Sequence, residues 1–172
     1  MNKTIPILAV AALALAITPT ANAGIITLTG NMTGQEGPIN TGSTATGFAT
    51  VIVDDVALTL SITMSYTGLT GGNPTAAHIH CCSTPAANSG VVVGLTGFPA
   101  TLSGTYSNTF NISGLSAATI TGIQTGLSYV NIHNTTFPGG EIRGQLTPTP
   151  EPATLGLVGV ALAGLGLLRR RR

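Results

Sequence analysis

The chain has 172 residues, of which only 6% are charged, and its formal net charge is +1. Four of its six basic residues form the terminal run 169–172, and the only basic residue between Lys3 and that run is Arg143. This composition excludes the basic surface that nucleic-acid binding requires, and the length suits one domain once the two ends are removed.

Residues 1–23 predict a cleaved signal peptide. Lys3 precedes an apolar run at residues 5–17, and Ala21 and Ala23 supply the small residues of an A-x-A cleavage site. Cleavage there makes Gly24 the first residue of the mature chain. An N-terminal membrane anchor is the alternative, but the apolar run is short for a bilayer. Export places the protein in an oxidising compartment.

The first half of the expected domain, residues 24–147, predicts β-strands. A short strand is expected at residues 25–28, followed by a loop rich in glycine and threonine up to residue 46. Apolar and polar residues then alternate through FATVIV and VALTLSITMSY, which is typical of a hairpin with one buried face. Asp54 and Asp55 between them are interpreted as turn residues, with calcium binding as the alternative.

The pattern continues with strands expected at residues 76–80, 91–95 and 101–113. A short helix or turn is expected at residues 116–125, with Ser116 as its cap and Gly126 as its stop. About seven antiparallel strands joined by glycine-rich connections predict an all-β fold, namely a Greek-key-like β-sandwich or a flattened barrel.

The stretch YVNIHNTTFPGGEIRGQL, residues 129–146, alternates with period two on both sides of a Pro-Gly-Gly turn. It predicts two strands whose core face carries Val130, Ile132, Ile142 and Leu146. Glu141 and Arg143 are two residues apart and are expected to point the same way. They are interpreted either as a partly buried pair with further hydrogen bonds or as an exposed pair of little energetic weight.

These runs, YVNIH and PGGEIRGQL, with AAHIH upstream, resemble the CHRD domain, first described in chordin and present in many bacterial exported proteins. The resemblance covers about residues 25–147. It implies an exported, non-catalytic binding or structural module. It also implies that the residues shared with the motif are structural: Asn131, Gly139, Gly140, Glu141, Arg143 and Gly144.

All three histidines, His78, His80 and His133, fall on these motifs. Residues two apart on a strand share a face, so His78 and His80, joined by His133 from a neighbouring strand, are candidate ligands for copper or zinc. The alternative is that they fix the motifs to each other, with His78 bonded to a backbone carbonyl or His133 to Glu141. The H-x-H strand resembles that of copper-zinc superoxide dismutase. A metal-dependent redox enzyme is therefore the alternative function, although that enzyme's other ligands have no counterpart here.

Cys81 and Cys82 are adjacent, where the CHRD family more commonly has Gly-Pro-Ala after HIH. In an oxidising compartment a disulfide between them, with a distorted peptide, is the leading interpretation. Metal-bound thiolates, free thiols and disulfides to a second chain are the alternatives. The sequence offers no Ser/His/Asp constellation, P-loop or dinucleotide fingerprint.

The C-terminal residues 148–172 closely resemble the PEP-CTERM sorting signal. A proline-rich linker leads to Pro150, Glu151 and Pro152, then to an apolar run at residues 153–168 expected to form a single transmembrane helix, then to Arg169, Arg170, Arg171 and Arg172. The resemblance implies processing by an exosortase, at least transient residence in the inner membrane, and a final place at the cell surface or in the extracellular matrix. A permanent membrane anchor is the alternative. Exopolysaccharide is the matrix partner that this placement implies, although with 4% aromatic residues no sugar-stacking platform is evident.

Overall fold

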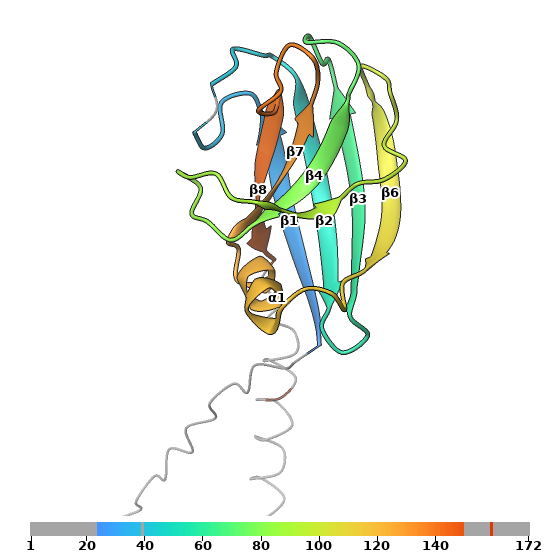
Figure 1. The fold of residues 1–172 in the computed structure, drawn as a ribbon, viewed down its shortest axis with the longest axis vertical. Helices are drawn as coiled ribbons and strands as arrows, with labels where there is room; N and C mark the ends of the chain where they lie inside the picture. The colour runs from blue at the N-terminus through green and yellow to red at the C-terminus, as the bar shows by residue number, and fades with distance from the viewer. Residues whose placement is uncertain (1–23, 39, 150–158, 160–172) are drawn as a thin grey trace, which may run out of the picture.

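The computed structural model describes residues 24–38, 40–149 and 159. Within these residues it contains eight strands and one helix, with the helix at one end of the strands (Figure 1). In chain order they are β1 (Ile25–Thr33), β2 (Thr46–Asp54), β3 (Thr59–Thr67), β4 (Ala76–Cys81), β5 (Val91–Gly94), β6 (Gly104–Asn111), α1 (Ala117–Gln124), β7 (Ser128–His133) and β8 (Ile142–Pro148). The predicted signal peptide and, apart from residue 159, the apolar segment 153–168 lie outside the described residues.

All eight strands belong to one antiparallel sheet in the order β5-β4-β7-β8-β1-β2-β3-β6. The two ends of the sheet come together beyond the edge strands. The Tyr106 hydroxyl on β6 donates to the carbonyl of Thr96, just after β5, at 2.7 Å. Phe98 packs against Tyr106 with ring centroids 5.1 Å apart. The sheet is therefore rolled into a nearly closed barrel, which confirms the all-β prediction in its flattened-barrel form.

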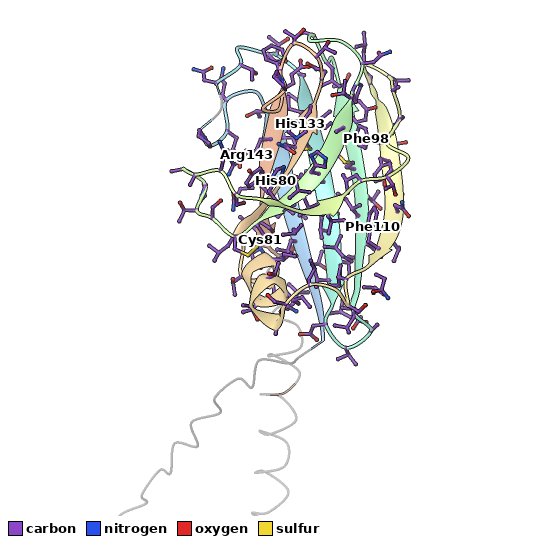
Figure 2. The ribbon with its side chains drawn as sticks, viewed as in Figure 1. His80, Cys81, Phe98, Phe110, His133 and Arg143 are labelled. Atoms are coloured by element: carbon purple, nitrogen blue, oxygen red, sulfur yellow. A yellow bond between two sulfur atoms is a disulfide. The ribbon has the colours of Figure 1, made fainter. Side chains whose placement is uncertain are left out.

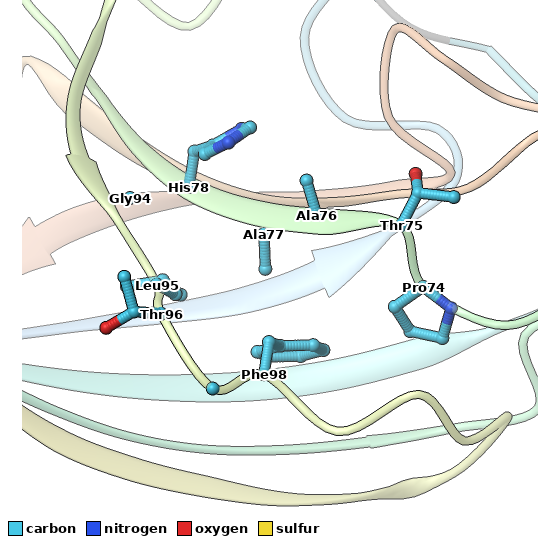
Figure 3. Close-up of a pocket in the computed structure, with 10 residues that line it drawn as sticks. Pro74, Thr75, Ala76, Ala77, His78, Gly94, Leu95, Thr96 and Phe98 are labelled. Atoms are coloured by element: carbon cyan, nitrogen blue, oxygen red, sulfur yellow. The ribbon is translucent and has the colours of Figure 1, made fainter.

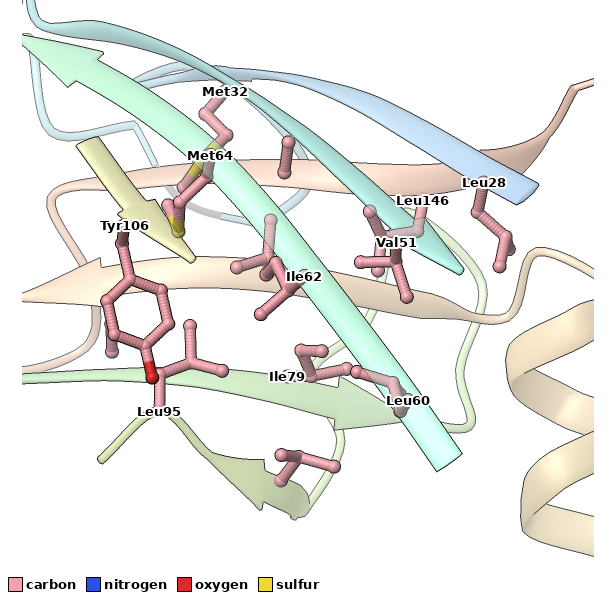
Figure 4. Close-up of a cluster of buried hydrophobic side chains, with 14 of the residues drawn as sticks. Leu28, Met32, Val51, Leu60, Ile62, Met64, Ile79, Leu95, Tyr106 and Leu146 are labelled. Carbon is pink, nitrogen blue, oxygen red and sulfur yellow. The ribbon is translucent and has the colours of Figure 1, made fainter. Parts of the chain in front are cut away.

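The interior of the barrel is filled by the apolar residues of the period-two pattern (Figure 4). On β3, Leu60, Ile62 and Met64 are each at most 2% exposed, while the threonines and serines between them face outward. Burying one such side chain contributes about 1.5–3 kcal/mol relative to exposure, so a one-residue slip of register would reverse every gain along the strand. The labelled core residues come from strands along the whole domain and from the segment after β5: Leu28, Met32, Val51, Leu60, Ile62, Met64, Ile79, Leu95, Tyr106 and Leu146.

Strand β1 differs from the prediction that it ends at Leu28. It continues to Thr33 because it lies between β2 and β8 in the sheet and pairs with β2 along its whole length. The polar residues Thr29 and Asn31 break no pattern, since they occupy the outward positions of a strand whose inward residues are Leu28 and Met32. The expected loop is thus confined to residues 34–45.

Helix α1 closes one end of the barrel and confirms the predicted helix. The Ser116 side chain accepts a hydrogen bond from the Thr119 amide, which caps the first turn. Ile120 and Ile123 are buried, and Gly126 has a φ of +86°, a conformation that suits glycine after a helix end. Among residues 24–38, 40–149 and 159, no helix is long and apolar enough to cross a bilayer.

Candidate functional site

The outer face of strands β4, β7 and β8 brings the two sequence motifs together. His78 pairs with Asn131, and His80 pairs with Tyr129, across β4 and β7. Asn131 in turn pairs with Arg143 across β7 and β8. Directly paired residues share a face of the sheet, so these side chains form one continuous surface. Figure 2 shows His80, His133 and Arg143 on neighbouring strands.

The three histidines converge on this surface. The Nδ1 atom of His78 lies 3.1 Å from the Nε2 atom of His133. One ring nitrogen from each of the three residues lies within 4.8 Å of the others. His80 is 8% exposed, whereas His78 and His133 are half-buried. We call His78, His80 and His133 the histidine cluster.

Backbone carbonyls fix the orientation of two of these rings. His80 Nδ1 lies 2.8 Å from the carbonyl oxygen of Ser89, and His133 Nδ1 lies 2.8 Å from that of Pro138. A carbonyl only accepts, so each of these nitrogens carries the hydrogen and the Nε2 atom of the neutral ring keeps its lone pair. The Nε2 atom of His80 is buried and makes no hydrogen bond of normal geometry among the described residues, although the Asn131 side chain lies near enough to raise the pKa of His80. The contact between His78 and His133 links the two motifs, as the alternative interpretation expects. The particular bonds suggested for it are wrong, since His133 bonds to the Pro138 carbonyl and not to Glu141, and His78 bonds to His133 and not to a backbone carbonyl.

Burial lowers the pKa of His78 and of His80 below the ordinary histidine value. The charge of His133 lowers both pKa values further, whereas the Ser89 carbonyl acts in the opposite direction on His80. These two rings therefore favour the neutral form, which is the form that ligates metals.

Arg143 extends the surface into a stack of three planar groups. The rings of His80 and Tyr129 are parallel within 4°, with centroids 4.7 Å apart, and Arg143 Cζ lies 3.4 Å from the Tyr129 centroid. Arg143 is 1% exposed and donates to the Asn88 side chain at 3.1 Å and to the Ala87 carbonyl at 3.0 Å. The guanidinium thus fastens the loop after β4 over the outer face, and burial lowers the pKa of Arg143.

Glu141 is a fully buried carboxylate, with 0% exposure, that is held by neutral donors. Its Oε1 atom accepts from the Ser43 hydroxyl at 2.6 Å and from the Thr70 amide and hydroxyl at 2.7 and 2.9 Å. Its Oε2 atom accepts from the Gly71 amide at 3.1 Å and from the Asn134 side chain. Burial alone would raise the pKa of Glu141, but the hydrogen bonds outweigh it and bring that pKa below the ordinary value. We call these five residues the Glu141 network.

The expected pairing of Glu141 with Arg143 is wrong. Strand β8 begins at Ile142, so Glu141 precedes the strand and does not follow its alternation. Its side chain turns toward the loops that contain Ser43 and Thr70, while Arg143 lies on the outer face. Each charge has its own partners. That both residues serve the structure stays a prediction; both are buried and hydrogen-bonded.

The remaining motif residues shape the same region. Gly144 lies so close to β1 that an added Cβ would sit 2.7 Å from the Asn31 carbonyl oxygen. Gly140 has a φ of +113°, and a Cβ there would come within 3.1 Å of the Asn131 amide nitrogen. Asn131 is itself 3% exposed, whereas Gly139 faces open space. At Gly140 and Gly144, two of the three motif glycines, a larger side chain would therefore clash with neighbouring atoms.

Cys81 and Cys82 form a disulfide, and the peptide bond between them is cis. Cys81 is the last residue of β4 and directly follows His80. The two sulfur atoms pack on helix α1 at Gly122, where an added Cβ would come within 3.0 Å of Cys81 Sγ. The disulfide thus lies between the histidine cluster and the helix.

The adjacent aspartates act in a turn. The Asp54 carboxylate accepts from the amides of Val56 and Ala57 at 3.0 and 2.7 Å, which is the local bonding that the turn interpretation predicts. The Asp55 carboxylate accepts from the Gln124 side chain on α1 at 3.0 Å.

A family model of the CHRD domain matches residues 27–146. The chain belongs to the CHRD domain family. A second model, the PEP-CTERM protein-sorting motif, matches residues 148–172. No curated protein and no solved structure matches the chain.

The sorting motif makes this CHRD protein an exported one, handled by exosortase-type machinery and anchored at the cell envelope during sorting. The individual residues of the two end segments lie outside the described residues, so the cleavage and sorting assignments stay predictions. They are Ala21 and Ala23 at the N-terminal end, and Pro150, Glu151, Pro152 and Arg169–Arg172 at the C-terminal end.

A second surface of the CHRD domain was missed by the sequence reasoning. The outward side chains of β1, β2, β3 and β6 are hydroxyl, amide and apolar groups, which we call the threonine face: Thr29, Asn31, Phe48, Thr50, Ile52, Ser61, Thr63, Ser65, Thr105, Ser107 and Thr109. Phe48 is 44% exposed, so an aromatic platform is present after all. The available signal was parity, because Phe48 and Ile52 share the outward positions of β2 with Thr50.

Two open hollows border Phe48. One, of about 360 Å³, includes Asn31, Thr46 and Ser65, and the other, of about 250 Å³, includes Thr29 and Gln145. A third hollow, of about 340 Å³, lies where the edges of the sheet meet and includes Ala77, Leu95 and Phe98 (Figure 3). His78 borders that hollow, but its ring projects to the side opposite Ala77.

Proposed function

We propose that this CHRD protein is a non-catalytic binding module of the cell envelope or extracellular matrix, and that it binds polysaccharide through the threonine face. The observation that carries the proposal is Phe48, an exposed aromatic ring set between two hollows lined by hydroxyl and amide side chains. Export and sorting by exosortase-type machinery bring the domain to the compartment where such a polymer is met.

The threonine face is a regular array of hydrogen-bonding groups. Strand register aligns Thr50 with Thr29 and with Thr63, and Thr63 with Ser107, in one row across four strands. Neighbouring hydroxyls already bond each other, as Ser61 does with Thr109 at 2.8 Å. Such groups both donate and accept, so they suit the hydroxyls of a sugar chain without requiring charge on it.

Phe48 supplies the apolar part of the contact. Register places it in a row between Asn31 on β1 and Ser65 on β3. The face of an aromatic ring stacks on planar or weakly polar surfaces, while the flanking amide and hydroxyl fix the orientation of what lies on the ring. A sugar ring has both kinds of surface, because its C–H groups lie on one face and its hydroxyls at the edge.

The non-catalytic part of the proposal rests on how the buried charges are used. Glu141 is held by five hydrogen bonds, and Arg143 is sandwiched between Tyr129 and a loop. Both groups are buried, and Glu141 is fully hydrogen-bonded, so they are poor proton donors and acceptors for a substrate. Catalysis needs a group that is within reach of a substrate and free to change its protonation state.

The test is affinity electrophoresis of the full chain in detergent, in gels that contain exopolysaccharide from the producing cells. We expect the polymer to retard the wild type, and Phe48→Ala to weaken binding about fivefold, since one aromatic stacking contact contributes about 1 kcal/mol. Phe48→Tyr should keep the affinity. Val56→Ala is the matched control, because Val56 is 74% exposed and lies in the turn after β2, outside the threonine face. The proposal would be refuted if the polymer left the mobility of the wild type unchanged, or if it retarded Phe48→Ala as much as the wild type.

A further inference from the structure

The geometry points to a metal site for one Cu²⁺ ion, with Zn²⁺ as the weaker ligand, held by His78, His80 and His133. The site lies on the outer face of β4 and β7 and is separate from the threonine face, which is built on β1, β2, β3 and β6. The inference therefore goes beyond polysaccharide binding, and neither proposal depends on the other.

The spacing of the nitrogens suits a single ion. Metal–nitrogen bonds of about 2.0–2.1 Å set neighbouring ligand atoms about 2.9 Å apart in the square arrangement of Cu²⁺ and about 3.3 Å apart in the tetrahedral arrangement of Zn²⁺. The His78 and His133 nitrogens are 3.1 Å apart, and the third nitrogen lies within 4.8 Å of both. A small closing movement within the histidine cluster brings the third nitrogen to this spacing.

The surrounding carbonyls prepare two of the rings for ligation. Ser89 and Pro138 each accept a hydrogen from Nδ1, so the Nε2 atoms of His80 and His133 carry lone pairs when the rings are neutral. The His133 Nε2 atom faces His78 Nδ1 at 3.1 Å, so a bound ion would take the place of the hydrogen between these two rings. Metal-bound histidines in proteins usually donate their second nitrogen to a carbonyl or carboxylate in this way, which fixes the tautomer and the ring orientation. For the third ring, His78, ligation requires the tautomer that leaves the lone pair on Nδ1.

The buried Nε2 atom of His80 is the observation that favours a ligand over a purely structural role. A buried polar atom without a hydrogen bond costs about 1–3 kcal/mol, so such atoms are rare without a reason. His80 is 8% exposed, and the stack with Tyr129 and the bond to Ser89 hold its ring in place. A metal ion at the centre of the histidine cluster would satisfy this atom.

The ligand chemistry selects the metal. Three neutral imidazoles suit copper and zinc, and the order of affinity for divalent ions places Cu²⁺ above Zn²⁺. The sulfur atoms of Cys81 and Cys82 are joined to each other, so they add no thiolate. His78 and His133 are half-buried, which leaves a side of the ion open for water or another small ligand.

The experiment uses the untagged full chain in detergent, stripped with EDTA and then loaded with Cu²⁺ or Zn²⁺ alone. We expect one equivalent of Cu²⁺ to survive dialysis and its paramagnetic resonance spectrum to show coupling to nitrogen. His78→Gln and His133→Gln should each lower Cu²⁺ affinity at least about 100-fold, which exceeds the usual effect of changing a residue that only supports a ligand. Circular dichroism of the metal-free proteins checks that both variants fold.

Phe48→Ala serves as the control for this site, because it alters the opposite face and should bind Cu²⁺ as the wild type does. Conversely, His133→Gln should keep the polysaccharide affinity of the wild type, so either proposal can be refuted without refuting the other. A folded wild type that retains neither metal, or equal Cu²⁺ affinity in His133→Gln, would overturn the site. Retention of Zn²⁺ in preference to Cu²⁺ would overturn the assignment to copper.

Discussion

Replacing Glu141 by glutamine should destabilise the domain far more than its small change in shape suggests. The carboxylate accepts three hydrogen bonds on Oε1 and two on Oε2. Glutamine turns one acceptor into a donor. If the new NH₂ group replaces Oε1 it faces the Thr70 amide, and if it replaces Oε2 it faces the Gly71 amide. Either orientation leaves at least one backbone N–H without an acceptor.

The cost follows from these contacts. An unsatisfied buried donor costs about 1–3 kcal/mol, and the surviving bonds lose the strengthening that a charged acceptor gives. We expect Glu141→Gln to lower the free energy of unfolding by about 3 kcal/mol, a large part of the total stability of a small domain. With a urea slope of about 2 kcal/mol per molar, the unfolding midpoint falls by about 1.5 M.

Urea unfolding at pH 7, followed by circular dichroism, measures this shift. Asp54→Asn is the matched control, since Asp54 uses only Oδ1 in its turn and its amide variant keeps that acceptor. It should change the free energy of unfolding by less than about 0.5 kcal/mol. A Glu141→Gln midpoint equal to that of the control would show that the Glu141 network adds no net stability, and the reasoning from buried donors would be refuted.

The same carboxylate predicts a pH dependence. The pKa of Glu141 is lower in the folded protein than its ordinary value of 4.5. Its stabilisation is therefore complete above the unfolded pKa and is lost as the pH falls through the folded pKa. Between neutral pH and about pH 3, the wild type should lose stability more steeply than Glu141→Gln, which cannot titrate at this position. Parallel curves for the two proteins would contradict the assignment of this loss to Glu141.

Three further predictions concern other sites. Arg143→Ala should lower the free energy of unfolding by about 2–4 kcal/mol, because it removes the stack on Tyr129 and leaves the Ala87 carbonyl without its donor; a loss below about 0.5 kcal/mol in urea unfolding would contradict this. With EDTA present to remove metal ions, the free energy of unfolding should rise from about pH 5 to pH 7. His78 and His80 take up protons near pH 6.5 in the unfolded chain but at lower pH in the folded protein, so the unfolded chain binds more protons in this range. His78→Gln should therefore flatten the rise of the urea midpoint with pH. Glu151→Ala should leave export intact but block processing, so mass spectrometry of fractionated cells should find the arginine tail retained in the inner membrane; identical C-termini in wild type and variant would indicate a plain anchor.

The predictable part of this fold is the part set by alternation. The period-two pattern of β3 places Leu60, Ile62 and Met64 in the core without reference to any other strand. The end of β1 was not predictable in this way, because the strand is extended by partners on both sides, and β8 lies more than a hundred residues away in sequence. Local pattern cannot report a pairing that depends on such distant residues.

The candidate sites also combine features that strand alternation predicts with features that it does not. That His78 and His80 share a face follows from their spacing, but the bonds to Ser89 and Pro138 come from loops whose course no periodicity describes. For Glu141, the error was to extend strand alternation one residue beyond the start of β8. For Phe48, apolar residues on both sides of β2 concealed that its parity is outward, since Val51 and Val53 take the inward positions.

The direction of the strands places the Glu141 network at the end of the barrel opposite the two chain ends. Both ends of the domain leave the barrel at the end with α1, where Thr149 donates to the Thr27 carbonyl at 2.8 Å (Figure 1). Strand β7 runs away from that end to His133, and β8 returns from Ile142 to Pro148. The turn between them, with Pro138 and the Glu141 network, therefore lies at the end remote from the sorting segment. The hydrogen bonds of Glu141 therefore stabilise the end of the barrel that is most distant from Thr149, where the chain leaves the domain toward the sorting motif.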